Sequence, residues 1–326
     1  MKRFRIIAFI LALLMIITVN VSCTGKDDVE NNVVENTKQE ENNENGVDNG
    51  AFPVEVEDKF GNKVVIEKEP MRIISISPSN TEILFALGLG DRIVGVSAFS
   101  DYPEEAKTKE VVGDAYGINL ERVIELQPDL VIFYGAGNEN EKKVLKEAGI
   151  NVLGFASENF DEIIEEIEVI GKATGRSEEA KKVIDSIKEK RDYVLEKIKD
   201  AKKVRVFYEI WHDPLMAAGK GSFMDELITL AGGENIAHDS DTPYPQYDLE
   251  LLIERDPEVY LASKDFDDKT IESIMARPGY ENISAIKNNR IYLFEGNEAN
   301  LVSRPGPRIG EALEVVAKAI HPELFK

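Results

Sequence analysis

The sequence NLERVIELQPDLVIF at residues 119–133 returns in related form as DLELLIERDPEVYLA at residues 248–262. Identical residues recur at the same offsets in the two copies: Leu120/Leu249, Glu121/Glu250, Ile124/Ile253, Glu125/Glu254 and Pro128/Pro257. A weaker repetition precedes each copy, where TEILFALGLGDRIVG (residues 81–95) resembles DELITLAGGENIA (residues 225–237). Such repetition indicates one supersecondary unit built twice, and two distant copies fit two similar lobes with a ligand cleft between them better than a solenoid.

Each copy has the pattern of a helix followed by a strand. Asn119 and Asp248 are good N-cap residues, and Glu121 and Glu250 then fall in the first helical turn, where a carboxylate meets the positive end of the helix dipole. The helix should end near the proline of each copy. A β-rich run follows, DLVIFYG in the first copy and EVYLAS in the second. This order predicts an α/β fold with a parallel sheet.

Residues 177–199 predict one long helix between the two halves of the repeat. Ser177 is the expected cap, Glu178 and Glu179 occupy the first turn, and apolar residues follow at helical spacing. About 23 residues at a rise of 1.5 Å each give a rod of roughly 35 Å. The expected architecture is two similar Rossmann-like lobes joined by a single long α-helix. We expect the N-terminal lobe at residues 52–175, the connecting helix at residues 176–201 and the C-terminal lobe at residues 202–326.

The N-terminus has the order of a signal peptide. Three basic residues among the first five precede an apolar run, residues 6–19, which is too short to span a bilayer comfortably. The run leads to Cys23, the only cysteine in the chain. Residues 1–23 therefore resemble the signal and lipobox of a bacterial lipoprotein with Cys23 lipidated, although Asn20 stands where Leu is usual. The alternative is a cleaved secretory signal with an incidental cysteine.

Residues 24–51 are rich in Asn, Glu and Asp, and contain no aromatic residue and no periodicity. Such a segment cannot bury enough apolar surface to fold, so we expect a disordered acidic tether. The globular part begins at Phe52 with FPVEVEDKFGNKVVIEKEP, which predicts a β-hairpin.

The composition excludes some classes of function. The formal net charge is −22 with no basic stripe, which argues against nucleic-acid binding. The sequence GKGS at residues 219–222 lacks the spacing of a phosphate-binding loop, and neither HExxH nor GxSxG occurs. With His212, His238 and His321 as the only histidines, a zinc or acid–base site is poorly supplied. We therefore expect no catalytic residue, no resident metal and no cofactor.

Several segments resemble the substrate-binding proteins of ABC importers, in the group that handles iron-siderophores, haem and cobalamin. The resemblance covers about residues 53–322. Its carriers are RIISISPSNTEILFALGLGDRIVGVS, SDYP, GINLERVIELQPDLVI, AGKGSFMDELITLAGGENIA and SRPGPRIGEAL. Cobalamin-binding members have segments similar to SDYPEEA, GGENI and TPYPQYDLE. The resemblance implies a monomer on the extracytoplasmic face of the cell membrane, anchored by lipid, which delivers cobalamin to a permease dimer with ATPase subunits. An iron(III)-siderophore or haem is the alternative ligand.

The resemblance also implies roles for particular residues. In the family, one exposed acidic residue on each lobe meets arginines of the permease, and Glu121 and Glu250 occupy those matching positions. The alternative is that both carboxylates only stabilise the helix dipole, which is worth about 0.3–1 kcal/mol.

Aromatic residues on loops are the candidates for the ligand pocket, since flat side chains cover a wide apolar ligand with little loss of entropy. They are Phe99, Tyr102, Tyr116, Tyr134, Trp211, Tyr244 and Tyr247. The resemblance favours Phe99, Tyr134, Trp211 and Tyr244, while Tyr116 stands in a loop where cobalamin-binding members have Trp. Arg304 could hydrogen-bond an anionic or amide-bearing ligand, and His212 could ligate a metal. Plain packing is the alternative for each aromatic residue.

A second class of function is an enzyme or sensory module that uses the same lobes, since fold does not fix function. Metal-cluster enzymes with two lobes on one helix need cysteine ligands. Because the only cysteine of this chain is Cys23, the sequence argues against that class.

Overall fold

The computed structural model describes residues 52–114, 117–264 and 268–326, which belong to one compact unit of the chain. The predicted signal peptide with Cys23, the predicted tether and the pocket candidate Tyr116 lie outside the described residues. Within the described ranges, no helix is both long enough and apolar enough to cross a membrane. We use "N-terminal lobe" for the elements before residue 176 and "C-terminal lobe" for the elements after residue 201.

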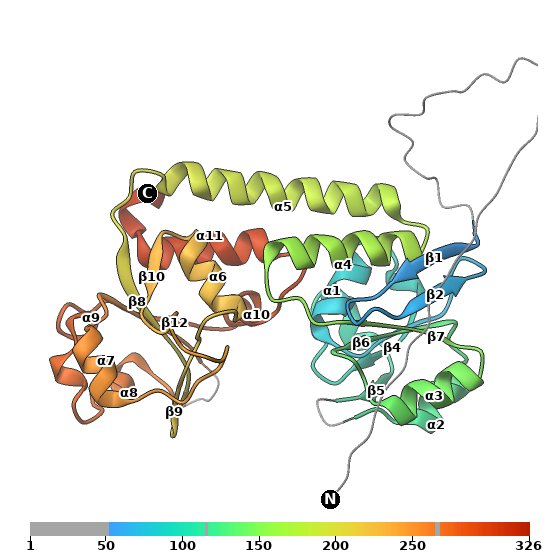
Figure 1. The fold of residues 1–326 in the computed structure, drawn as a ribbon, viewed down its shortest axis with the longest axis horizontal. Helices are drawn as coiled ribbons and strands as arrows, with labels where there is room; N and C mark the ends of the chain where they lie inside the picture. Colours follow the sequence, from blue (N-terminus) through green and yellow to red (C-terminus); the bar gives the residue numbers. More distant parts are fainter. Residues whose placement is uncertain (1–51, 115–116, 265–267) are drawn as a thin grey trace, which may run out of the picture. The chain divides into compact units, whose positions relative to one another are not determined.

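The N-terminal lobe is built around a parallel sheet with the strand order β5-β4-β3-β6-β7 (Figure 1). Its strands are β3 (Ile73–Ser75), β4 (Ile93–Ser97), β5 (Val111–Gly113), β6 (Leu130–Tyr134) and β7 (Asn151–Phe155). Its helices are α1 (Pro78–Ala86), η1 (Gly90–Arg92), η2 (Glu104–Thr108), α2 (Leu120–Glu125), α3 (Glu139–Glu147) and α4 (Phe160–Ala173). Before the sheet, β1 (Val54–Glu57) and β2 (Lys63–Ile66) form the antiparallel hairpin that the sequence predicts.

The C-terminal lobe repeats this plan with the parallel strand order β10-β8-β11-β12. Its strands are β8 (Val204–His212), β9 (Leu215–Ala217), β10 (Gly233–Asn235), β11 (Val259–Ser263) and β12 (Ile291–Phe294). Its helices are α6 (Phe223–Leu230), α7 (Leu249–Arg255), α8 (Ile271–Met275), η3 (Tyr280–Asn282), α9 (Ser284–Lys287), α10 (Asn297–Ser303), α11 (Ile309–Ile320) and η4 (Pro322–Phe325). The short strand β9 pairs antiparallel with β8.

The two sequence repeats form equivalent helix-and-strand units, as predicted. The Asn119 side chain accepts a hydrogen bond from the backbone N–H of Arg122 at the start of α2. The Asp248 side chain accepts from the N–H of Glu250 and of Leu251 at the start of α7. β6 follows α2 and β11 follows α7, and each of these strands lies inside its sheet. The predicted α/β class with parallel sheets is confirmed.

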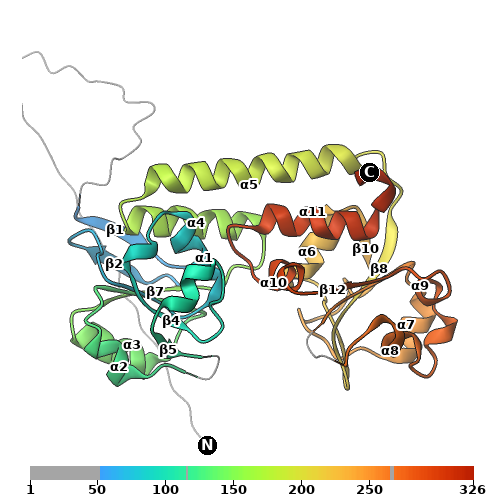
Figure 2. The ribbon, with the colours of Figure 1, turned by 180° about the vertical axis from the view of Figure 1, so that it is seen from behind.

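Helix α5 (Ser177–Ile198) connects the lobes and runs along α4 and α11 (Figures 1 and 2). Close contact depends on two glycines. A Cβ at Gly171 of α4 would lie 2.5 Å from the Cβ of Ala180, and one at Gly310 of α11 would lie 2.8 Å from the Cβ of Lys190. The long helix is as predicted, but Ser177 as its cap was wrong: the Ala180 N–H already bonds to the Arg176 carbonyl, so Ser177 lies inside the first turn.

Other differences lie at connections. Helix α1 begins at Pro78, because Ser77 caps the helix and proline suits its first position. Helix α10 was not predicted. Its sequence, NEANLVS, has few apolar residues, and it is stabilised by packing against α6, α11 and β12 rather than by its own pattern.

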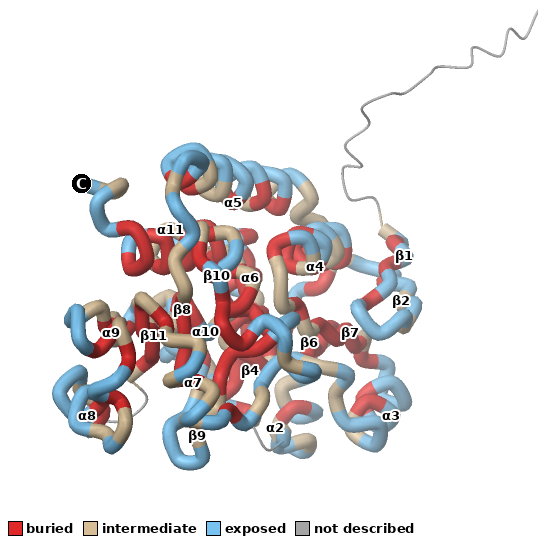
Figure 3. The backbone as a smooth tube through the Cα atoms, turned by 60° about the vertical axis from the view of Figure 1, so that its left-hand side comes forward, coloured by how far each residue is buried: buried red, intermediate tan, exposed pale blue. Residues whose placement is uncertain are grey.

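The main hydrophobic core extends through both lobes and α5. It includes Phe160 of α4, Ile187 of α5, Met224 of α6 and Leu313 of α11. A separate cluster fills the far side of each sheet, around Val131 in one lobe and Phe207 in the other. Figure 3 shows the inner strands β4, β6 and β11 as mostly buried and much of α5 as exposed. Since the lobes share one core beneath α5, they resist independent motion there.

Candidate functional site

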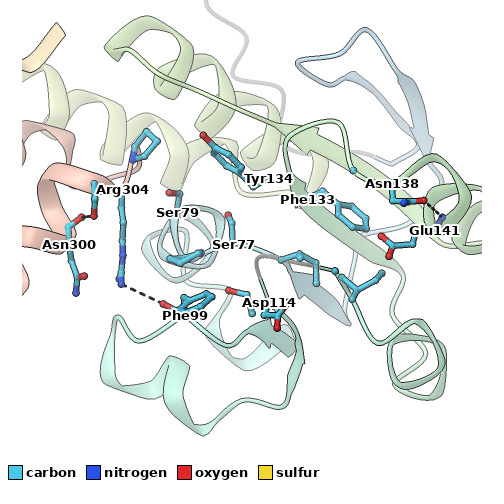
Figure 4. A pocket seen from close by; sticks show the side chains of 18 residues that line it. Ser77, Ser79, Phe99, Asp114, Phe133, Tyr134, Asn138, Glu141, Asn300 and Arg304 are labelled. Carbon is cyan, nitrogen blue, oxygen red and sulfur yellow. Dashed lines mark hydrogen bonds between the residues drawn. The ribbon is translucent and has the colours of Figure 1, made fainter. Parts of the chain in front are cut away.

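A cavity of about 680 Å³ lies at the carboxyl ends of the N-terminal lobe's strands, facing α10 (Figure 4). The residues that line it are Ile76, Ser77, Pro78, Ser79, Ser97, Phe99, Asp114, Gly117, Ile118, Phe133, Tyr134, Gly137, Asn138, Glu141, Asn300, Ser303, Arg304 and Pro305. In open parallel sheets this crevice outside the strand ends is where ligands bind. The volume is within the range of small-molecule pockets.

Hydroxyl groups make up the polar floor of the cavity, because the turn from β3 into α1 is built from serines. Ser77 caps α1 by accepting a hydrogen bond of 3.1 Å from the N–H of Asn80. Behind this turn, Thr81 Oγ1 contacts Ser75 Oγ at 2.9 Å and Ser100 Oγ at 3.0 Å. These buried hydroxyls fix the turn, so this part of the cavity wall is held in place before any ligand arrives.

Two of the predicted aromatic residues line this cavity. Phe99, which follows β4, is 56% exposed, and Tyr134, at the end of β6, is 47% exposed. Both rings border the open space in Figure 4. Because both line the cavity and keep about half of their surface exposed, these two residues are the best-placed of the predicted set.

Tyr244 does not line the cavity, but it meets Tyr134 at a carboxylate that the sequence did not single out. The Tyr134 hydroxyl donates to Glu158 Oε1 at 3.0 Å, and the Tyr244 hydroxyl donates to Glu158 Oε2 at 3.3 Å. Burial raises the pKa of Glu158, and burial together with the Glu158 charge raises the pKa of Tyr244 to about 12. Glu158 therefore joins predicted aromatic residues of the two lobes.

Glu158 also belongs to a reciprocal contact between the lobes. It accepts a hydrogen bond of 3.1 Å from the N–H of Phe223, the first residue of α6. In return, Glu226 of α6 accepts one of 2.9 Å from the N–H of Phe160, the first residue of α4. Burial raises the pKa of Glu226 to about 7. Each lobe thus caps a helix of the other.

Trp211 and His212 lie at the end of β8, where the chain turns back into β9, and neither lines the cavity. The Trp211 indole is 36% exposed and donates to the Asp213 carbonyl at 2.8 Å. His212 is exposed and stacks against Trp211. In the described ranges, no group of His, Cys, Asp and Glu could hold a metal ion. A ligand role for either residue stays a prediction.

Arg304 lines the cavity, as expected of a ligand contact, yet it already has acidic partners. Its guanidinium lies 2.6 Å from Asp101 and 3.4 Å from Glu82. Burial would raise the pKa of Asp101, but the hydrogen bond from Arg304 lowers it. Arg308 makes two bonds of 2.7 Å to the buried Glu82, as a structural residue would. Arg304 and Arg308 thus bind the C-terminal lobe to the N-terminal lobe.

The remaining aromatic candidates have structural roles. The Arg308 guanidinium lies 3.7 Å from the ring centre of Tyr102, a cation–π contact. Tyr247 is buried against Phe207, and its hydroxyl donates to the Ile236 carbonyl. These contacts are of the kind that the packing alternative expects, and neither residue lines the cavity.

Two acidic residues of the cavity wall were missed by the sequence analysis. Asp114 follows β5, and Glu141 lies in the first turn of α3, whose N-cap is Asn138. Each follows a strand of the sheet, so their position at its carboxyl edge was a usable signal. Charged residues on loops are common, however, and only the fold shows which of them face a cavity.

Glu121 and Glu250 are both exposed, in the first turns of α2 and α7. Among the described residues, neither carboxylate has an ion-pair partner within 4.0 Å. Helices α2 and α7 lie on the side of the molecule away from α5 in both views (Figures 1 and 2). The positions are therefore available to a partner.

Comparisons with known proteins agree with this architecture. A family described as periplasmic binding protein matches residues 73–297. The chain is 37% identical over 284 residues to an uncharacterized ABC transporter substrate-binding lipoprotein, YvrC, of Bacillus subtilis, covering 85% of this chain and 88% of the relative.

Solved structures give the same result. The periplasmic vitamin B12 binding protein BtuF of Vibrio cholerae has a TM-score of 0.67 and 30% identity, over 79% of this chain and 98% of that one. A possible iron-binding (periplasmic solute-binding) protein of Staphylococcus epidermidis has a TM-score of 0.68 and 34% identity, over 78% of this chain and all of that one.

Members of this family are extracytoplasmic binding proteins rather than enzymes, and they work with a permease and its ATPase. The match covers more than half of the chain, and the lobes and connecting helix agree with it. The chain therefore belongs to the periplasmic binding protein family and is the substrate-binding component of an ABC importer.

Proposed function

We propose that this protein captures a cobalamin-like corrinoid and delivers it to its permease. The observation that carries the proposal is the cavity of about 680 Å³ with Phe99 and Tyr134 exposed at its wall. A corrinoid has a broad apolar face, which such rings cover at low entropic cost. The resemblance to a protein named for binding vitamin B12 supports this ligand.

The polar lining supports the same class of ligand. Primary amides at the edge of a corrin ring both donate and accept hydrogen bonds. The cavity offers hydroxyls at Ser77, Ser79 and Ser303, amides at Asn138 and Asn300, and carboxylates as acceptors. A ligand rich in amides satisfies such mixed groups, whereas a purely apolar ligand would leave them unpaired at a cost of about 1–3 kcal/mol each.

Calorimetry with the full-length protein in detergent and cyanocobalamin tests the proposal. We expect tight one-to-one binding with a negative heat-capacity change, since apolar surface is buried. Absence of binding to cyanocobalamin, with binding of another chelate, would disprove the proposed ligand and leave the family assignment intact.

The alternative ligand is an iron(III)-siderophore or haem. It is favoured by the likeness to the possible iron-binding protein of Staphylococcus epidermidis. The visible spectrum of protein purified from its native cells separates these ligands, because corrinoid, haem and ferric siderophore absorb differently.

Docking to the permease dimer is assigned to Glu121 and Glu250, one exposed carboxylate from each lobe. Their matched positions on α2 and α7 support a partner with two similar halves. The binding protein itself acts as a monomer in this proposal.

Anchoring to the membrane is assigned to lipidation of Cys23, supported by the signal-like segment before it and the relative described as a lipoprotein. Cys23→Ser should release the protein from the membrane fraction or leave it unprocessed. Normal processing and unchanged membrane association of the variant would contradict the lipid anchor.

A further inference from the structure

We propose that Asp114 and Glu141 make the cavity selective for the charge of its ligand, admitting uncharged or cationic, hydrogen-bond-donating ligands and rejecting anionic ones. This inference rests on the proposed function, because it takes the cavity at Phe99 and Tyr134 as the ligand pocket. It divides the candidates by class: an amide-bearing corrinoid is admitted, and a porphyrin dicarboxylate or an anionic catecholate chelate is rejected.

The first step is the arrangement of charges on the cavity wall. Asp114 follows β5 and Glu141 lies on α3, and both line the cavity (Figure 4). Within the described residues, the Glu141 carboxylate has no hydrogen bond and no ion pair; its backbone N–H alone bonds to Asn138. A bound ligand removes water from this carboxylate, so the ligand must supply a donor or bear the cost of a desolvated charge.

The second step concerns Arg304, the basic residue of the lining. Its charge is shared with Asp101 and Glu82, and Glu82 also holds Arg308. This cluster contains two arginines and two carboxylates, so its net charge is zero. An anion at Arg304 would therefore meet a guanidinium whose charge is already balanced, with Asp101 only 2.6 Å away.

The third step compares magnitudes. The start of α1 faces the cavity through Ser77 and that of α3 through Asn138, and each helix N-terminus contributes the equivalent of about +0.5 charge. Asp114 and Glu141 together contribute two negative charges. Glu158, behind Tyr134, adds negative charge whenever it is ionised. The negative side therefore exceeds the positive, and the chain's net charge of −22 has the same sign.

The test compares two ligands on the full-length protein in detergent: cyanocobalamin, which has no net charge, and haemin, which carries two propionates. The variant is Asp114→Asn with Glu141→Gln, which preserves shape and removes two charges. We expect haemin to bind the double variant on the order of tenfold more tightly than the wild type at low salt. Added salt should reduce this difference, since it screens partly exposed charges.

The matched control is Glu125→Gln with Glu147→Gln, which removes the same charge from exposed positions of α2 and α3 outside the cavity lining. Haemin affinity that fails to rise in the cavity variant, or that rises equally in the control, overturns the inference. Cyanocobalamin binding by the wild type is a separate measurement, which tests the proposed ligand. If the wild type does not bind it, the proposed ligand fails, while the haemin comparison still decides whether the cavity selects by charge.

Discussion

The two lobes share one plan but differ in how the first strand of each sheet connects to the next helix. In the N-terminal lobe, β3 passes directly into α1 through Ser77, and the cavity opens at that turn. In the C-terminal lobe, β8 first turns back into β9 before α6 begins. Trp211 and His212 lie in this extra hairpin, at the end of β8, where they pair with β9.

The interiors beneath these strand ends differ in the same way. The N-terminal lobe has neutral hydroxyls there, such as Ser75 and Thr81. The C-terminal lobe buries Glu209, which Lys269 meets at 3.0 Å and which Arg277 and Tyr260 also contact. The small hydroxyl groups of the N-terminal lobe leave room for a ligand. In the C-terminal lobe, the Glu209 carboxylate is already paired with Lys269 and Arg277. The comparison indicates that α2 and α7, the repeated helices, offer matching positions to a two-fold partner. The ligand site instead depends on the connection between β3 and α1, which differs between the lobes.

The largest expected effect is a loss of stability when the buried Glu209 of the C-terminal lobe is changed. Glu209→Gln removes the counter-charge of Lys269 and Arg277 in a buried setting, so we expect a loss of about 3–5 kcal/mol in unfolding free energy. Ser75→Ala in the other lobe should cost about 1 kcal/mol, the worth of a neutral hydrogen bond. Urea unfolding measures both. Similar losses from the two variants would contradict the proposed difference between the strand ends.

The next effect tests the exposed glutamate that each lobe carries on its repeated helix. Glu121→Ala and Glu250→Ala should each reduce uptake in cells and the double variant more, while ligand affinity stays at the wild-type value. Removing one partner of a charge pair at a partly buried interface often costs about 2–5 kcal/mol of binding free energy.

Matched controls come from the same repeat. Glu125 and Glu254 are exposed residues of the same two helices, and Glu125→Ala and Glu254→Ala should leave uptake normal. Unchanged uptake in the Glu121/Glu250 double variant would leave both carboxylates with the dipole role alone.

A smaller effect compares aromatic residues across the lobes. Phe99→Ala should weaken cobalamin binding by about tenfold to a hundredfold, the equivalent of about 1.5–3 kcal/mol for a large side chain. Trp211→Ala should weaken it less, because Trp211 does not line the cavity. Calorimetry gives both affinities. A larger loss from Trp211→Ala would show that the ligand extends onto the β8–β9 hairpin.

The smallest effect concerns pH at the contact between the lobes. Burial raises the pKa of Glu226 from about 4.5 to about 7, so the folded protein favours the neutral carboxyl. This contribution to stability is complete below pH 4.5 and is lost as pH rises through about 7. Because Glu226 is only partly buried, we expect about 1 kcal/mol, or roughly 2–3 °C in Tm.

Glu226→Gln should therefore raise Tm at pH 8 relative to wild type and have little effect at pH 5. Glu165→Gln, an exposed change on α4, is the control. A Glu226→Gln effect of equal size at both pH values would show that the carboxyl does not titrate in this range.

Much of the fold could be predicted from the sequence, because the repeat encodes local chemistry. Asn119 and Asp248 are caps by residue type, and apolar periodicity indicated the long helix. The site was harder to predict. Phe99 and Tyr134 followed strands and were found. Glu141 was missed because only the fold shows that it faces the cavity, and Glu158 was missed because its partners are distant in sequence. Tyr244 and Glu158, for example, are 86 residues apart. Local sequence patterns cannot predict contacts between residues so far apart in the chain.

The reciprocal capping of α4 and α6 has a consequence for how opening can be observed. The Phe160 and Phe223 amides are each held by a carboxylate of the opposite lobe. Any rotation that separates the two helix ends releases both amides to water in one step. After correction for their intrinsic exchange rates, the two amides should therefore show equal protection against hydrogen–deuterium exchange. This protection should report how often the lobes part, with no ligand required.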